Sequence, residues 1–255
     1  MKAIRLSHFL VPLAVLGAAC TLMAQGPGGR GGFGFGGGRD LFNFTGKTIT
    51  GAPFTASITS QSVETLSNGT SIQREETGQV ARDSSGRVMV NTSTTRPNSS
   101  GGTQTVSSIT IYDPVAGYIY RLNPQKMTGV QMPIRQRTAS PRTVTRPTNP
   151  NVATLSLGTA NRNGVNATGT QVTRTIPTGT IGNSQAIQSV RHTWVSSDLQ
   201  IPVEITVTDP RSGNRSMDLT NIAQSEPDGS LFTVPSGYTI TSGPGRGPGG
   251  QFRPR

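Results

Sequence analysis

The chain has 255 residues, of which only 14% are charged, and Lys and Arg outnumber Asp and Glu by 23 to 12. The net charge of +11 could suggest a nucleic-acid-binding protein. However, most of the excess falls in segments rich in Gly or Pro, whereas such a protein needs a basic patch fixed on a fold. The single cysteine, Cys20, excludes an intrachain disulfide and a thiolate metal cluster.

Residues 1–24 have the layout of a secretory signal peptide. Lys2 and Arg5 precede an apolar run at residues 9–19, and the small residue Ala24 follows it. The apolar run is shorter than the roughly 20 residues that a transmembrane helix needs. Cleavage after Ala24 predicts an exported protein, either periplasmic, associated with the outer membrane or secreted. Cleavage before Cys20 is the alternative, and lipidation of that cysteine would then anchor the protein to a membrane.

Glycine-rich segments flank the predicted domain at residues 41–242. Residues 25–40 are typical of a flexible linker, because they contain too few large side chains to offset the backbone entropy of folding. Residues 243–255 form a basic tail that we also expect to be disordered. The arginines of both termini predict weak contact with anionic membrane surfaces. No nucleic-acid partner is predicted.

Between the termini, the apolar residues alternate as in β-strands. The pair Asn68–Gly69 predicts a hairpin between residues 53–66 and 70–82. Further strands are expected near residues 87–95, 105–112, 118–122 and 127–132, and Tyr118, Tyr120 and Leu122 should share one face. A Pro- and Arg-rich loop follows at residues 133–150. Strands then resume from residue 153, with a second turn at Asn163–Gly164, and we expect one antiparallel all-β domain with about 11 strands and little helix.

The stretch LFTVPSGYTI, residues 231–240, is unusually apolar for this chain. With the preceding Trp-bearing strand and the strand that begins at Pro202, it resembles the C-terminal half of the LolA/LolB-like superfamily of periplasmic lipoprotein carriers, over residues 155–240. The resemblance implies a single curved sheet that forms an incomplete β-barrel. We expect Asp228 to start a short helical turn and Tyr238 to begin an edge strand. The predicted closing segment has five main residues: Leu231, Phe232, Pro235, Gly237 and Tyr238.

No catalytic or metal-binding constellation is predicted. His192 is the one histidine outside the signal peptide, so a multi-histidine metal site is excluded. Asp113, Asp209 and Asp228 all stand in turn contexts, where Asp side chains accept hydrogen bonds from the backbone. We therefore expect no enzyme activity and no cofactor.

Two functions remain open. The sheet could enclose an apolar cavity that binds or carries a lipid, an acyl chain or a lipoprotein. Alternatively, its own side chains could fill it, which would make the protein a structural or surface-interaction module. A packed Trp194 beside a half-exposed His192 is one reading of that strand, and cavity lining is the other. The candidate lining residues are Tyr118, Tyr120, His192, Trp194, Val203, Ile205 and Val207. The sequence leaves the oligomeric state open.

Overall fold

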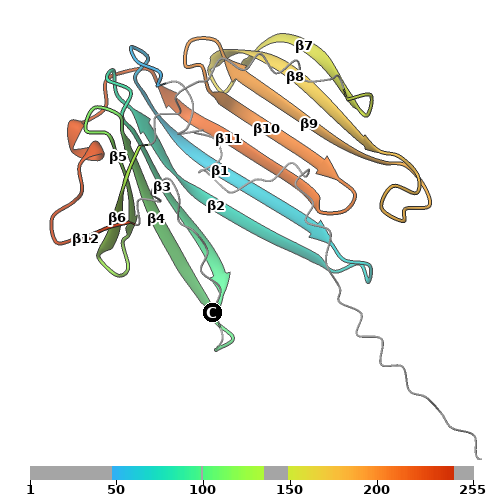
Figure 1. Cartoon of the computed structure of the whole chain (residues 1–255), viewed down its shortest axis with the longest axis horizontal. Coiled ribbons are helices and arrows are strands. Elements are labelled where there is room, and N and C mark those ends of the chain that lie inside the picture. The colour runs from blue at the N-terminus through green and yellow to red at the C-terminus, as the bar shows by residue number, and fades with distance from the viewer. Residues whose placement is uncertain (1–47, 99, 135–148, 244–255) are drawn as a thin grey trace, which may run out of the picture. The chain divides into compact units, whose positions relative to one another are not determined.

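A computed structural model describes residues 48–98, 100–134 and 149–243 (Figure 1). The predicted signal peptide, linker, Cys20 and basic tail, and most of the predicted Pro- and Arg-rich loop, lie outside these residues. The described strands are β1 (Phe54–Thr65), β2 (Ser71–Arg82), β3 (Val88–Pro97), β4 (Thr103–Asp113), β5 (Tyr118–Asn123), β6 (Thr128–Pro133), β7 (Val152–Arg162), β8 (Val165–Ile176), β9 (Ile187–Ser196), β10 (Pro202–Asp209), β11 (Gly213–Ala223) and β12 (Thr239–Ser242).

All twelve strands belong to one open sheet, in the order β12-β6-β5-β4-β3-β2-β1-β11-β10-β9-β8-β7. Neighbouring strands are antiparallel except β12 and β6, which run parallel. The pairing of β1 with β11 joins the two halves of the chain, which are far apart in sequence. The prediction of an all-β chain with one incomplete barrel sheet is confirmed, with twelve described strands against the expected eleven.

Local turn chemistry explains the hairpins. Asn163 and Gly164 both have positive φ, at 53° and 89°, which is the backbone of a two-residue type I′ turn between β7 and β8. Gly69 has a φ of 82° in the turn between β1 and β2. Both hairpins were predicted from these Asn–Gly pairs.

The strand registers define two faces. The first, the Phe54 face, carries Phe54, Ile58 and Ser62 of β1 and their cross-strand partners, such as Leu219 and Arg74. The second, the Trp194 face, carries Trp194 and the partners that extend from it along the sheet through Glu204 and Asp218.

The end of the Phe54 face near the start of β1 is filled with apolar side chains, and we call it the closed end. Phe54, Ile58, Val80, Met217 and Leu219 are all buried there, in one cluster with Leu199 and Ile201 of the β9–β10 turn. Burial of so many branched and aromatic side chains is the main force that holds the strands together.

Arg82 connects three segments of the chain at this closed end. Its side chain is only 2% exposed, donates two hydrogen bonds to the Ala52 carbonyl and one to the Leu199 carbonyl, and lies 5.1 Å from the centroid of the Phe54 ring. Burial lowers the pKa of Arg82 to about 10. The guanidinium thus ties the segment before β1 and the β9–β10 turn to the end of β2.

The closing segment covers part of the Trp194 face, over β2 to β5. Phe232 is buried against Ala81, Met89, Ile111 and Leu122, and Tyr120, Leu231 and Tyr238 pack around this second cluster. The predicted helical turn is a 3₁₀ turn, Gly229–Phe232, and the Asp228 carboxylate caps it by accepting a hydrogen bond from the Ser230 N–H at 2.8 Å.

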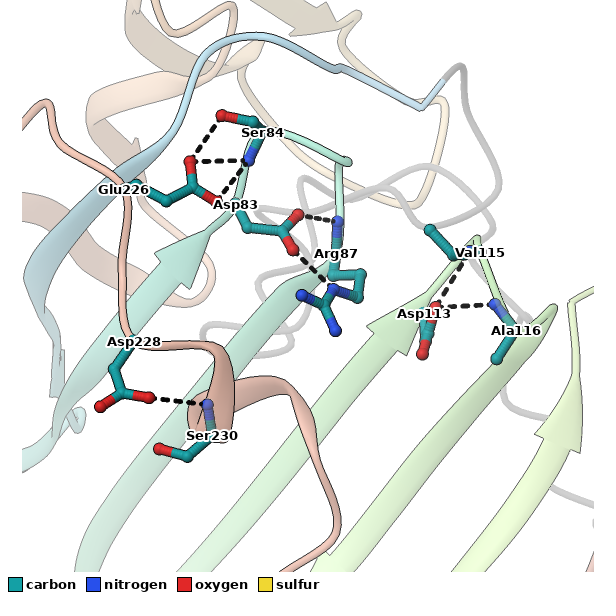
Figure 2. Close-up of polar contacts among 9 residues, drawn as sticks. All are labelled: Asp83, Ser84, Arg87, Asp113, Val115, Ala116, Glu226, Asp228 and Ser230. Atoms are coloured by element: carbon teal, nitrogen blue, oxygen red, sulfur yellow. Dashed lines mark hydrogen bonds and ion pairs between the residues drawn. The ribbon is translucent and has the colours of Figure 1, made fainter.

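Further contacts hold the closing segment to the hairpin between β2 and β3, as Figure 2 shows. Ser84 donates its backbone N–H and its hydroxyl to the Glu226 carboxylate. The Arg87 guanidinium, outside the contacts drawn there, lies 5.1 Å from the centroid of the Phe232 ring. After Pro235, Gly237 takes a φ of 86°, and the chain enters β12 at the sheet edge. The expected edge strand therefore begins one residue after Tyr238.

Of the residues that the structure describes, none belongs to a helix with the length and apolar character required to cross a membrane.

Candidate binding groove

A groove of about 690 Å³ opens at the other end of the Phe54 face, where β1, β2, β3, β4 and β11 lie side by side. We call this the groove end. The lining residues are Ser60, Gln61, Ser62, Arg74, Glu75, Glu76, Thr92, Thr94, Arg96, Val106, Ser108, Arg215 and Ser216. Ten of them lie on the Phe54 face by register, whereas Gln61, Glu75 and Ser216 alternate to the Trp194 face.

The groove arises because the apolar alternation of the strands stops halfway along their length. In β1 the Phe54 face runs from Phe54 through Ile58 to Ser60 and Ser62. Val106 is the one aliphatic residue in the lining. Short hydroxyl side chains do not fill the space above the sheet, so this end stays open and polar.

Three arginines give the groove its charge. Ser62 is paired with Arg74 on one side and with Arg215 on the other, so the three side chains form a row across β2, β1 and β11. Arg96 lies two residues beyond Thr94, whose pairing with Glu76 is the last of the β2–β3 ladder at this end, and it belongs to the groove lining on the same face.

The carboxylates of the lining already have partners. Glu76 accepts a hydrogen bond from the Thr94 hydroxyl at 3.2 Å, and Glu75 accepts one from the Gln61 amide at 3.0 Å. Within the described residues, Arg74, Arg96 and Arg215 take part in no ion pair. The hydroxyl of Ser60, buried at the groove floor, likewise has no hydrogen-bond partner there.

These arginines were not among the site residues predicted from the sequence. Their signal in the sequence was the exchange of apolar for polar residues at alternating positions, as in Val80, Glu76 and Arg74 of β2. That pattern assigns residues to one face of a single strand, but it does not indicate which strands lie beside it. Only the pairing of β1 with β11, two strands far apart in the chain, brings Arg215 next to Arg74 across Ser62.

The seven candidate lining residues fall into three places by strand register. Val203, Ile205 and Val207 are buried on the Phe54 face and belong to one apolar cluster with Trp194. They run along β10 from the closed end to Val207, which pairs with the groove residue Arg215. Tyr118 and Tyr120 lie on the other face at β5, and their ring centroids are 6.3 Å apart. Tyr120 packs in the cluster below the closing segment, while Tyr118 is 38% exposed.

Trp194 and His192 occupy the third place, on the Trp194 face of β9. Trp194 is 7% exposed, and its ring lies over Gly169 of β8, where an added Cβ atom would come within 2.7 Å of it. The Arg162 guanidinium is 4.1 Å from the ring centroid. His192 is half-buried and hydrogen-bonds to Gln171 and Thr206. Trp194 is therefore packed by its own neighbours.

The acidic residues expected in turns hold the backbone there. Asp113 accepts hydrogen bonds from the N–H groups of Val115 and Ala116 (Figure 2), and Asp209 accepts one from the Arg211 N–H. The Arg211 side chain also donates to Asp209, which lowers the pKa of that carboxyl to about 2. No group of three or more His, Cys, Asp or Glu in the described ranges could hold a metal ion.

The sequence matches no family model and no curated protein. Among solved structures, a chain of the MucA/MucB complex of Pseudomonas aeruginosa is 10% identical, with a TM-score of 0.42 over 79% of this chain and 62% of that chain. This chain thus spans less than two thirds of the length of that chain.

Two further structures match over most of their own length. Lipoprotein LppX from Mycobacterium tuberculosis is 12% identical, with a TM-score of 0.28 over 69% of this chain and 90% of that chain. The LolA superfamily protein NE2245 from Nitrosomonas europaea is 9% identical, with a TM-score of 0.25 over 76% and 96%. The solved structures that match this chain include this one protein named as a member of the LolA superfamily.

Proposed function

We propose that this protein is an exported, non-enzymatic binding protein of the cell envelope that holds an amphipathic lipid at the groove end of the Phe54 face. The observation that carries the proposal is the groove itself, with a volume of about 690 Å³. Binding sites are concave and few per protein, and they combine space with a few convergent polar groups.

The position of the groove defines which part of a lipid it suits. Val203, Ile205 and Val207 are buried along β10, from the closed end to the level of the groove, so an acyl chain finds no space among them. The groove end offers hydroxyl and guanidinium groups instead, with Val106 as the apolar contact near the opening of the sheet. A lipid would therefore place its polar head group in the groove and the beginning of its chains beside Val106.

The alternative function, a structural or interaction module, is favoured by the packing of the closed end and of Trp194. In that case the groove would be a solvated surface without a ligand. Thermal stability separates the two functions, because a ligand that binds only the folded state raises its stability by RT ln(1 + [L]/Kd), about 2.7 kcal/mol at a hundredfold excess over Kd.

The test uses the mature chain and soluble short-chain phospholipids below their micelle concentration. We expect a rise in the thermal midpoint that Ser62→Trp abolishes, since the indole would occupy the middle of the groove. Thr77→Trp is the matched control, because Thr77 is exposed on the opposite face of the neighbouring strand. A thermal midpoint that no lipid changes, or an equal response of Ser62→Trp and the wild type, would favour the structural module.

A further inference from the structure

The part of the groove lining on the Phe54 face contains three arginines and one carboxylate, Glu76, so it carries a net positive charge. Arg74 and Arg215 flank Ser62 on the two neighbouring strands, and Arg96 belongs to the same lining, two residues beyond the end of the β2–β3 pairing. We propose that the groove selects lipids with an anionic phosphate head group, which these three arginines hold. This inference rests on the proposed function and names the chemical class of its ligand.

The spacing of the row suits a phosphate. Adjacent strands are about 4.8 Å apart, so the backbones of Arg74 and Arg215 lie on the order of 10 Å from each other. Arginine side chains are long enough to bring two guanidinium groups together above Ser62, and its hydroxyl offers one more donor. Guanidinium groups present paired N–H donors that match phosphate oxygens bidentately.

The electrostatics of the free groove point the same way. Like charges within one groove repel one another, and here no acidic side chain of the described residues forms an ion pair with Arg74, Arg96 or Arg215. Glu76 is the nearest carboxylate of the lining on this face, and it accepts the Thr94 hydroxyl hydrogen bond. A bound anion would convert this repulsion into attraction.

The chain's own undescribed segments do not carry the complementary charge. Residues 135–148 contain four arginines and no acid, residues 244–255 contain three arginines and no acid, and residues 1–47 contain five basic residues and one acid, Asp40. Charge complementarity therefore points to an anion from outside the chain.

The decisive experiment compares soluble lipids with identical short acyl chains and different head groups. Calorimetric titration of the mature chain should give at least tenfold tighter binding of phosphatidic acid and phosphatidylglycerol than of zwitterionic phosphatidylcholine. Arg74→Gln and Arg215→Gln should each reduce the affinity for the anionic lipids about tenfold and leave phosphatidylcholine binding unchanged. Retained thermal midpoints of both variants would show that the fold is intact.

Arg121→Gln is the matched control. Arg121 is exposed on the Phe54 face of β5, outside the groove lining, so its replacement lowers the net charge equally without touching the groove. An Arg121→Gln effect as large as that of Arg74→Gln would attribute the selectivity to the overall charge and overturn the proposal.

The remaining outcomes are distinguishable. Equal affinity for all three lipids, unaffected by the arginine variants, would overturn the head-group selectivity and leave lipid binding in place. Absence of any lipid binding would overturn the proposed function as well.

Glycerol 1-phosphate and an acidic peptide serve as competitors. If either competitor displaces phosphatidic acid at comparable concentration, the ligand is a free phosphate compound or an acidic peptide and not a lipid.

Discussion

The closed end and the groove end of the Phe54 face are built from the same strands but have opposite properties. In β1, Phe54 and Ile58 are buried at the closed end. Ser60 and Ser62, two and four residues after Ile58 on the same face, line the groove. In β2, Arg82 is enclosed at the first end and Arg74 is exposed at the second. Strand alternation therefore assigns a side chain to one face of the sheet. Its position along the strand determines whether the side chain is buried in the closed end or lines the groove.

The largest effect should come from emptying the closed end. Phe54→Ala removes a side chain that is 0% exposed and the ring next to Arg82, so we expect unfolding free energy to fall by about 3 to 5 kcal/mol. Val106→Ala in the groove, where the side chain is 39% exposed, should cost less than about 1 kcal/mol. Urea denaturation measures both, and equal losses would remove the distinction between the two ends.

Two arginines of one strand provide the second comparison. Arg82→Met would leave the carbonyls of Ala52 and Leu199 without their hydrogen bonds, and we expect a loss of about 2 to 4 kcal/mol. Arg74→Met removes a charge that has no ion-pair partner in the described chain and should change stability by no more than about 0.5 kcal/mol. Thermal unfolding of the two variants should therefore separate them clearly, and a large loss in Arg74→Met would make it a structural residue.

Asp209 shows that charge on the Phe54 face can also be structural. The Arg211 hydrogen bond lowers the pKa of Asp209 from 3.8 to about 2, so the stabilisation is present above pH 4 and disappears as the pH falls toward 2. That shift corresponds to roughly 2 kcal/mol, and the 39% exposure of the Arg211 side chain reduces the expected contribution to about 1 kcal/mol. Asp209→Asn should lack this part of the acid dependence, and stability curves of the two proteins that stay parallel between pH 4 and pH 2 would contradict it.

The smallest effect concerns the opposite face. Burial, and then the nearby charge of Glu204, raises the pKa of Asp218, whose neighbours across the sheet are Glu204 and Thr59. Because the folded-state pKa lies above the unfolded one, the ionised carboxylate costs stability at neutral pH. Asp218→Asn should therefore stabilise the protein at pH 7 by about 0.5 kcal/mol, and this gain should vanish below pH 3. A destabilised variant at pH 7 would show that the carboxylate has a favourable partner.

The strands and hairpins were predictable because they depend on local features. Asn68–Gly69 and Asn163–Gly164 define their turns through backbone conformation, and the closing segment was recognised from its dense apolar residues around Phe232. The candidate lining was less accessible to sequence reasoning. Val203 was predicted to line a cavity, and Trp194 either to line it or to pack. Alternation within a single strand assigns residues to a face, but it does not show whether that face is open or filled.

The all-β class and the positions of the turns followed from the sequence, because each depends on neighbouring residues in the chain. The tertiary structure alone decided the order of the strands, the two faces and the groove. The antiparallel pairing of β1 with β11 places Arg215 and Arg74 on either side of Ser62, although Arg215 lies far from both in the chain. Such long-range pairing follows from burying the apolar end of the whole sheet at once, and no single segment encodes that requirement.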